Sequence, residues 1–224
     1  MQTMSRRSFL LASLGVASLC LAGCGSGASG AASMSAASAS AVPSSSTSSC
    51  VTSASGEYAS GTHHATIEVE GYGAIKLELD ADVAPVTVAN FAKLAGEGFY
   101  DGLTFHRIIE GFMVQGGDPN GNGTGGSDEK VVGEFSDNGH PNSISHVRGT
   151  ISMARSQAYN SASSQFFIMQ ADTPSLDGQY AAFGHVTEGM DVVDAMCEAA
   201  RPTDNNGTIA AADQPRIASA KMDD

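Results

Sequence analysis

The sequence predicts a mainly β domain that closes into an antiparallel barrel, on three observations. Short stretches in which apolar and polar residues alternate recur along the C-terminal part of the 224-residue chain, for example at 64–70 and 74–80. Glycine-containing turns separate these stretches, beginning with Gly71-Tyr72-Gly73. Apolar residues recur at helical spacing in two places, near 83–95 and 189–199. Many short strands with few helices are typical of a barrel, which leaves no sheet edge unpaired.

The first 23 residues have the pattern of an export signal. Arg6 and Arg7 precede an apolar run, Phe9–Leu21, that is shorter than the ~20 residues a membrane-spanning helix needs. The run ends in Leu21-Ala22-Gly23-Cys24, which resembles a lipobox. We therefore predict a signal peptide over 1–23, lipidation of Cys24, and an extracytoplasmic domain anchored to the membrane. A plain secretory signal or a misread start is the alternative. The export route is either the general secretory or the twin-arginine pathway.

Residues 24–60 are rich in Ser, Ala and Gly and contain little apolar surface to offset the entropy cost of ordering the chain. This composition predicts a disordered tether, so the globular domain is expected at 61–224. Cys50 and Cys197 remain once Cys20 is removed and Cys24 is lipidated, and they are free to pair or not in an oxidising compartment.

The stretch 105–118, FHRIIEGFMVQGGD, reads as two short strands that bend at Glu110-Gly111. Because side chains of a strand alternate between faces, Arg107, Met113 and Gln115 can share one face. Phe112 falls outside this alternation unless the bend rotates it. An ordinary core hairpin with one surface arginine is the alternative interpretation.

This stretch resembles the signature of the cyclophilin family of peptidyl-prolyl isomerases. Further segments follow in the family's order, and the similarity runs from about Thr62 to the C-terminus: Gly123-Thr124-Gly125-Gly126, Ile151-Ser152-Met153-Ala154, Ser164-Gln165-Phe166-Phe167-Ile168, Leu176-Asp177-Gly178 and Phe183-Gly184. The resemblance implies a closed eight-stranded antiparallel barrel with a helix covering each end. It also implies an enzyme that rotates X-Pro peptide bonds in proline-containing polypeptides, here exported proteins.

The resemblance assigns the site residue by residue. Arg107 is the expected donor to the twisted amide, with Phe112 and Gln115 completing the catalytic set. The expected substrate-binding residues are His106, Met113, Ala154, Arg155, Gln165, Phe167, Leu176 and Tyr180. Ser175 departs from the family pattern, because family members often carry Trp or His at this position.

Other sequence features bear on ligands and partners. Asp118, Asn120, Asn122, Gly123 and Glu129 match a calcium-loop pattern, although the flanking segments do not read as the two helices that such a loop requires. We expect no metal and no cofactor. With 24 acidic and 11 basic residues, the chain is not expected to bind nucleic acid. We expect a monomer.

Two other functions remain open. A chaperone-like binding module could use the same barrel without catalysis, although a pure binder does not need Arg107. A lipoprotein that delivers a solute to a transporter would be expected to have two lobes and a longer chain.

Overall fold

The computed structural model describes residues 50–224. The predicted signal peptide, Cys24 and the greater part of the predicted tether lie outside the described residues. Within 50–224, no helix combines the length and the apolar character needed to cross a membrane.

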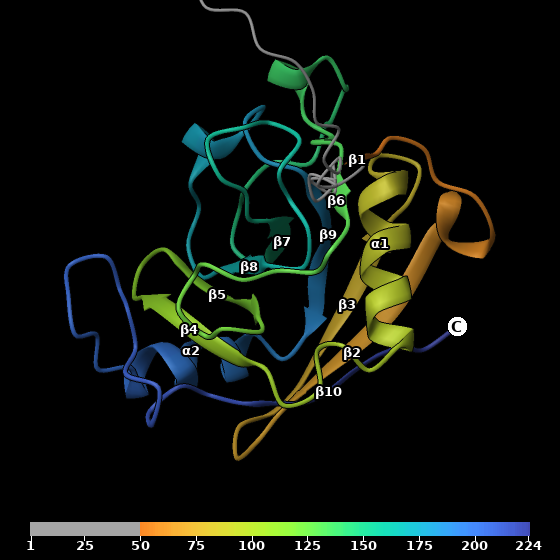
Figure 1. Ribbon diagram of the computed structural model, residues 1–224. Coiled ribbons are helices and arrows are strands. Elements are labelled where there is room, and N and C mark those ends of the chain that lie inside the picture. Colours follow the sequence, from red (N-terminus) through yellow and green to blue (C-terminus); the bar gives the residue numbers. More distant parts are fainter. Residues whose placement is uncertain (1–49) are drawn as a thin grey trace, which may run out of the picture. The chain divides into compact units, whose positions relative to one another are not determined.

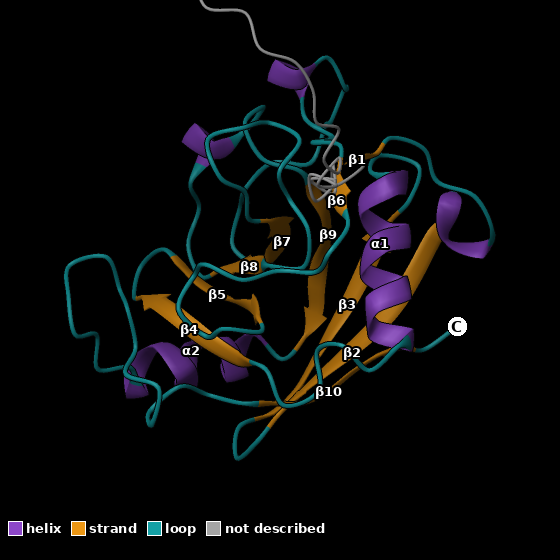
Figure 2. Cartoon of the chain, in the orientation of Figure 1, coloured by secondary structure: helices purple, strands orange, loops and turns teal. Residues whose placement is uncertain are grey.

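Most of the described strands form one antiparallel sheet, in the order β10-β2-β3-β9-β7-β8-β5-β4 (Figures 1 and 2). These strands are β2 (Thr62–Val69), β3 (Gly73–Asp80), β4 (Thr104–Ile109), β5 (Met113–Asp118), β7 (Thr150–Met153), β8 (Phe166–Met169), β9 (Ala182–Glu188) and β10 (Ile217–Met222). Strands β1 (Cys50–Val51) and β6 (Lys130–Val131) pair in parallel in a separate two-stranded sheet. The strands predicted at 64–70 and 74–80, and the two predicted within 105–118, are therefore confirmed as β2, β3, β4 and β5.

The prediction of a closed barrel is wrong. The sheet curls into an open half-barrel, and its edge strands β4 and β10 are not neighbours in a ladder. The two edges meet at a single bridge between Thr104 and Arg216. Beyond that point the outer edge of β4 pairs with the loop before β10 instead: Ile108 N–H donates to the Gly207 carbonyl at 2.9 Å, and Ile209 N–H donates to the His106 carbonyl at 3.0 Å. This loop satisfies the edge that β10 would otherwise cover.

Two α-helices and three single 3₁₀ turns complete the described part. Helix α1 (Pro85–Gly96) packs against β10, β3 and β6, and helix α2 (Met190–Ala199) packs against β3, β4 and β5. Both predicted helices are thus confirmed. The 3₁₀ turns are η1 (Glu57–Ala59), η2 (Ser136–Asn138) and η3 (Pro174–Leu176).

The start of α1 is capped from a distant segment. Its own N-cap residue, Ala84, offers no side-chain acceptor. The buried carboxylate of Glu134 instead accepts the Val86 N–H at 3.0 Å and the Thr87 N–H at 2.8 Å. An anion at this position satisfies two orphan donors and complements the positive end of the helix dipole.

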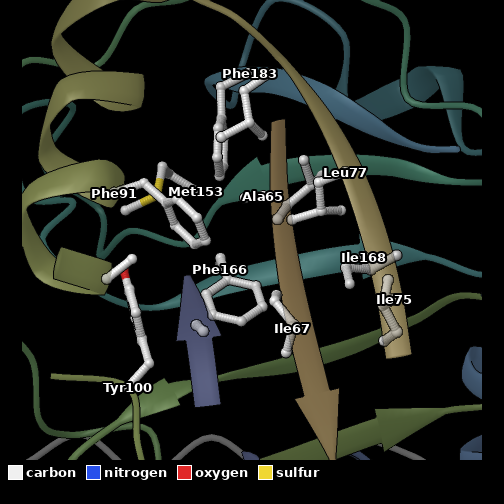
Figure 3. Packing of buried hydrophobic residues seen from close by; sticks show 14 of the residues in the cluster. Ala65, Ile67, Ile75, Leu77, Phe91, Tyr100, Met153, Phe166, Ile168 and Phe183 are labelled. Carbon is white, nitrogen blue, oxygen red and sulfur yellow. The ribbon is translucent and has the colours of Figure 1, made fainter. Parts of the chain in front are cut away.

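The two faces of the central strands serve different purposes. Figure 3 shows Phe91 of α1, Tyr100, and Phe166 and Phe183 of β8 and β9 packed in the main core. Phe166 and Ile168 of β8 point into this core, whereas the alternate residues Phe167 and Met169 join Met113 in a second, smaller apolar cluster. The second cluster forms the floor of the site described below.

Residues 50–60, which the sequence led us to place in the tether, take part in the fold of the described chain. Strand β1 pairs with β6, and η1 packs against α1, so residues 50–60 belong to the folded unit. Val51 supplies the physical reason, because its carbonyl accepts the Val132 N–H at 2.9 Å. Cys50 and Cys197 are both free thiols in this structure.

Candidate active site

An open pocket of about 150 Å³ lies over the second apolar cluster. It is lined by Arg107, Phe112, Met113, Gln115, Ala154, Arg155, Phe167, Leu176 and Tyr180. Strands β4, β5 and β8 and the turn between β4 and β5 supply the residues on one side. The segment after β7 supplies Ala154 and Arg155, and the segment from η3 to Tyr180 supplies the rest. The volume is that of a cavity which accommodates one benzene-sized ring.

The central hairpin places its residues as the alternation predicted. Arg107 of β4 pairs with Gln115 of β5, and Gln115 pairs with Phe167 of β8, so the three side chains share one face of the sheet. Gly111 at the bend has a positive φ of 74°, which favours glycine. The bend also turns Phe112 into the pocket, although it lies outside the strict alternation.

A chain of hydrogen bonds fixes the polar edge of the pocket. Arg107 Nη1 donates to Gln115 Oε1 at 3.2 Å, and Gln115 Nε2 donates to Gln165 Oε1 at 2.9 Å. Gln165 Nε2 in turn donates to the Gly125 carbonyl at 2.8 Å. Every amide in this chain therefore has a set orientation, with its donors directed away from Arg107.

Arg107 is held by the backbone as well. Its Nε donates to the Asn206 carbonyl at 2.7 Å, in the same loop that covers the edge of β4. Burial lowers the pKa of Arg107, while the nearby Tyr180 and Asp204 raise it. A guanidinium nevertheless stays protonated at every pH at which a protein functions. The pocket thus has a fixed cationic donor beside an apolar floor.

Aromatic contacts build the floor and one wall. Tyr180 meets Phe167 edge to face, with ring centroids 5.7 Å apart, and His146 stacks against Phe167 at 6.0 Å. His146 is only 1% exposed; its Nδ1 lies 2.9 Å from Asp177 Oδ1 and its Nε2 lies 3.1 Å from Ser152 Oγ. Burial lowers the pKa of His146, although Asp177 acts in the opposite direction. The ring is therefore a neutral support behind the pocket.

The sequence-based assignment expected His106 among the substrate-binding residues, but His106 does not line the pocket. His106 precedes Arg107 on β4, where the register with β5 shifts between Phe105 and Arg107, and its side chain is 3% exposed. Neither ring nitrogen has a hydrogen-bond partner among the described residues. Burial lowers the pKa of His106, against the raising effect of the Asp118 charge. The family-like position thus marks a core histidine in this chain.

The remaining expected site residues fall in three places. Gln165 lies next to the pocket and lines an adjoining groove. Ser175 is exposed on η3 beside Leu176 and is not among the lining residues, and Cys24 lies outside the described residues. Sequence reasoning missed the supports, His146 and Asn206. Nothing local marks them, because each acts on a residue far away in the chain.

The calcium-loop pattern has a different role. Strand β5 ends at Asp118 and strand β6 follows, so the two flanking helices are not present in this part of the described chain. The Asp118 carboxylate accepts backbone N–H groups of Asn120, Asn122 and Gly123. Desolvation raises the pKa of Asp118, but these hydrogen bonds together bring it below its usual value. Glu129 pairs with Lys93 at 2.6 Å. No group of three or more His, Cys, Asp or Glu suited to a metal ion occurs within 50–224.

The lining of the pocket limits the chemistry. Among the described residues that line it, none carries a carboxylate, imidazole, thiol or aliphatic hydroxyl, and Tyr180 contributes a phenol. General acid-base or nucleophilic catalysis mostly uses the groups that are missing from this lining. The arrangement is suited instead to gripping a small apolar ring while a fixed cation stabilises a change in the adjoining polar group.

Comparisons with known proteins agree with this geometry. Residues 64–222 match the family model described as "Cyclophilin type peptidyl-prolyl cis-trans isomerase/CLD". The chain is 48% identical over 124 residues to a peptidyl-prolyl cis-trans isomerase of Synechococcus elongatus, an alignment that covers 55% of this chain and 80% of that protein. It is 46% identical over 128 residues to peptidyl-prolyl cis-trans isomerase B of Bacillus subtilis, covering 57% and 86%.

Solved structures show the same fold. A crystal structure of a cyclophilin-type peptidyl-prolyl cis-trans isomerase from Cryptosporidium parvum superposes with a TM-score of 0.65 at 29% identity, over 73% of this chain and 99% of that one. A second crystal structure of that protein, in the presence of the dipeptide Ala-Pro, gives a TM-score of 0.63 at 30% identity, over 72% and 99%.

Proposed function

Since this chain belongs to the cyclophilin family and is a peptidyl-prolyl cis-trans isomerase, we propose that its pocket holds the proline ring of an X-Pro bond while Arg107 lowers the barrier to rotation. Phe112, Met113 and Phe167 supply the apolar surface for the ring, and Leu176 and Tyr180 close its rim. The Ala-Pro dipeptide used with the Cryptosporidium parvum protein supports a proline-containing substrate.

One observation supports this role most directly: a fixed guanidinium stands beside a ring-sized apolar pocket. Rotation of an X-Pro bond breaks no covalent bond but must overcome a barrier of ~20 kcal/mol that comes from amide resonance. In the twisted state the prolyl nitrogen regains its lone pair, so it becomes a better hydrogen-bond acceptor than in the planar amide. A donor placed at the nitrogen or at the adjoining carbonyl therefore binds the transition state more tightly than the ground state.

Gln115 has a supporting role in this proposal. Its oxygen faces Arg107 and its amino group faces Gln165, so it has little freedom to turn. We assign it to orienting the substrate backbone, with Ala154 and Gln165 forming the adjacent groove. Arg155 lies at the boundary between pocket and groove.

The direct test is an isomerisation assay of the purified full chain on a short X-Pro peptide. Uncatalysed exchange takes ~10–100 s at room temperature, and we expect the enzyme to shorten it by orders of magnitude. The chaperone-like binding module would bind the peptide and leave the exchange rate unchanged. That result would reject the assignment of these residues to catalysis.

We further propose that the domain acts on exported proteins from a lipid anchor at Cys24. The support is in the sequence: a short apolar run that ends in Leu21-Ala22-Gly23-Cys24. The segment from Cys24 to the first described residue, Cys50, is about 25 residues of Gly/Ser-type composition; as a flexible linker it would have a root-mean-square reach of ~25–30 Å. That reach allows the pocket to meet chains emerging near the membrane.

Cys24→Ser tests the anchor. We expect the variant to leave the membrane fraction or to remain an unprocessed precursor, because the cysteine thiol is the site of lipid attachment. The measurement is fractionation followed by intact mass of the membrane-bound form. A mature wild-type protein that begins after the signal but carries no acyl mass would exclude lipidation without affecting the isomerase assignment.

A further inference from the structure

A second cavity, of about 270 Å³, adjoins the proline pocket. The two share Gln115, Ala154 and Arg155 in their linings. The rest of this second lining comes from Gly123, Thr124, Gly125, Lys130, Ser156, Ser161, Ser163 and Gln165. A polypeptide with its proline in the first pocket therefore passes directly along the second, which we call the cationic groove.

The charge of the groove contrasts with that of the chain. The whole chain has a formal charge of −13, yet the groove contains Lys130 and Arg155 and no carboxylate among its described lining residues. Elsewhere Lys76, Lys93, Arg148 and Arg216 lie within 4 Å of carboxylates. Lys130 and Arg155 form no such ion pair with any residue of the described part. Lys130 Nζ donates to the Ser127 carbonyl at 3.5 Å, a neutral acceptor that leaves its charge uncompensated.

Arg155 is held in place by neutral partners. Its guanidinium carbon lies 4.7 Å from the ring centroid of Tyr180 and 5.1 Å from those of Phe135 and Tyr159. Its Nε donates to the Gln179 carbonyl at 2.9 Å, and its Nη1 donates to the Ser156 carbonyl at 2.9 Å. Ring faces and carbonyls attract the cation without neutralising it. Nη2 makes no hydrogen bond with a described residue, so it can donate to a ligand.

The other polar side chains of the groove mostly bond to one another. Ser156 Oγ donates to Ser161 Oγ at 2.9 Å, and Ser161 Oγ donates to the Ala158 carbonyl at 2.6 Å. Gln165 is engaged by Gln115 and by the Gly125 carbonyl. The two cations are therefore the groups best able to distinguish one substrate side chain from another.

We propose that the cationic groove selects substrates with a carboxylate side chain two residues away from the proline. In an extended peptide, side chains two residues apart point the same way and lie roughly 7 Å apart, which suits two cavities that share three residues. This inference rests on the proposed function, because the proline must occupy the first pocket. It gives the enzyme a preference for Glu or Asp near the X-Pro bond.

The test measures kcat/KM of the full chain on peptides that differ at one position, either two residues before or two residues after the proline. Glu, Gln and Lys are compared at each position. We expect Glu to exceed Gln by about two- to fivefold at one of the positions, with Lys slowest, as for a partly exposed ion pair. The net negative charge of the protein acts in the opposite direction, so a Glu preference identifies a local cation. The preference should shrink at high salt.

Substitutions of Lys130 test whether this residue causes the preference for Glu. Lys130→Gln should reduce the Glu-to-Gln ratio and Lys130→Glu should reverse the order of Glu and Lys. Lys221→Glu is the matched control, because it changes net charge equally but lines neither cavity, and it should keep the wild-type order. Equal rates on all three peptides at both positions would overturn the proposal while leaving the isomerase intact. A Glu preference untouched by Lys130→Glu would also overturn it, and inactivity on every peptide would reject the proposed function itself.

Discussion

Replacing Arg107 by alanine removes the fixed cationic donor of the proline pocket. Hydrogen bonds from charged groups contribute about 1.5–3 kcal/mol. If Arg107 makes one such bond only in the twisted state, its loss lowers kcat/KM by roughly tenfold to more than a hundredfold. The loss should appear in kcat with little change in KM, because the donor distinguishes transition state from ground state.

Arg107→Ala also has a structural cost. The variant loses the 2.7 Å bond from Nε to the Asn206 carbonyl and the 3.2 Å bond from Nη1 to Gln115 Oε1. A bond from a charged donor is worth about 1.5–3 kcal/mol, and each kcal/mol lowers Tm by ~2–4 °C for a domain of this size. Arg216→Ala is the matched control. It loses a 2.8 Å bond from Nη1 to the Gly102 carbonyl but lines neither cavity, so activity should persist.

The assay is peptide isomerisation followed by exchange NMR or a protease-coupled readout, with Tm recorded for each variant. Because a guanidinium does not titrate in this range, kcat/KM should be level between pH 6 and 8. A folded Arg107→Ala variant with turnover within about twofold of wild type would refute the electrostatic argument. A bell-shaped pH profile would instead implicate a histidine.

Three further predictions concern stability and ligand binding. Burial lowers the pKa values of His106 and His146, so below about pH 6.5 the unfolded chain takes up protons that the folded chain does not. The free energy of unfolding, measured by denaturant titration, should therefore fall as the pH drops from about 7 to 5, by at most about 1.4 kcal/mol per pH unit for each histidine, and should change little between about pH 7 and 8. An unfolding free energy that stays constant from pH 7 to 5 would contradict this. Ser175→Trp should tighten binding of cyclosporin, the inhibitor associated with the family, more than it changes kcat/KM, because an aromatic face adds apolar contact; equal, tight inhibition of both forms would place Ser175 away from the rim. Glu134→Gln should lower the free energy of unfolding by about 1–3 kcal/mol, since one of the two acceptors at the start of α1 is lost. The control, Glu129→Gln, weakens an exposed ion pair and should lower the free energy of unfolding by at most ~1 kcal/mol. Equal losses in the two variants would argue against the capping role of Glu134.

The sequence was a good guide wherever the signal is periodic and local. Alternation predicted the strands of the hairpin around Gly111 and placed Arg107, Met113 and Gln115 on one face. The rule does not place His106, because the register of β4 with β5 shifts between Phe105 and Arg107, and Phe105 lies in the main core although it is two residues from Arg107. The family pattern grouped His106 with the site, but His106 is not among the residues that line the pocket.

The sequence alone therefore determined the type of each main element and the half of the site that lies on β4 and β5, because a period of two or 3.6 residues is set by the backbone of a single segment. Only the tertiary structure decided that the sheet stays open, since the loop at Gly207 takes the edge of β4. It also decided that Arg155 rests among the rings of Phe135, Tyr159 and Tyr180. Contacts of this kind join residues far apart in the chain, and they depend on how the strands are arranged in the sheet and on which loop lies along its edge.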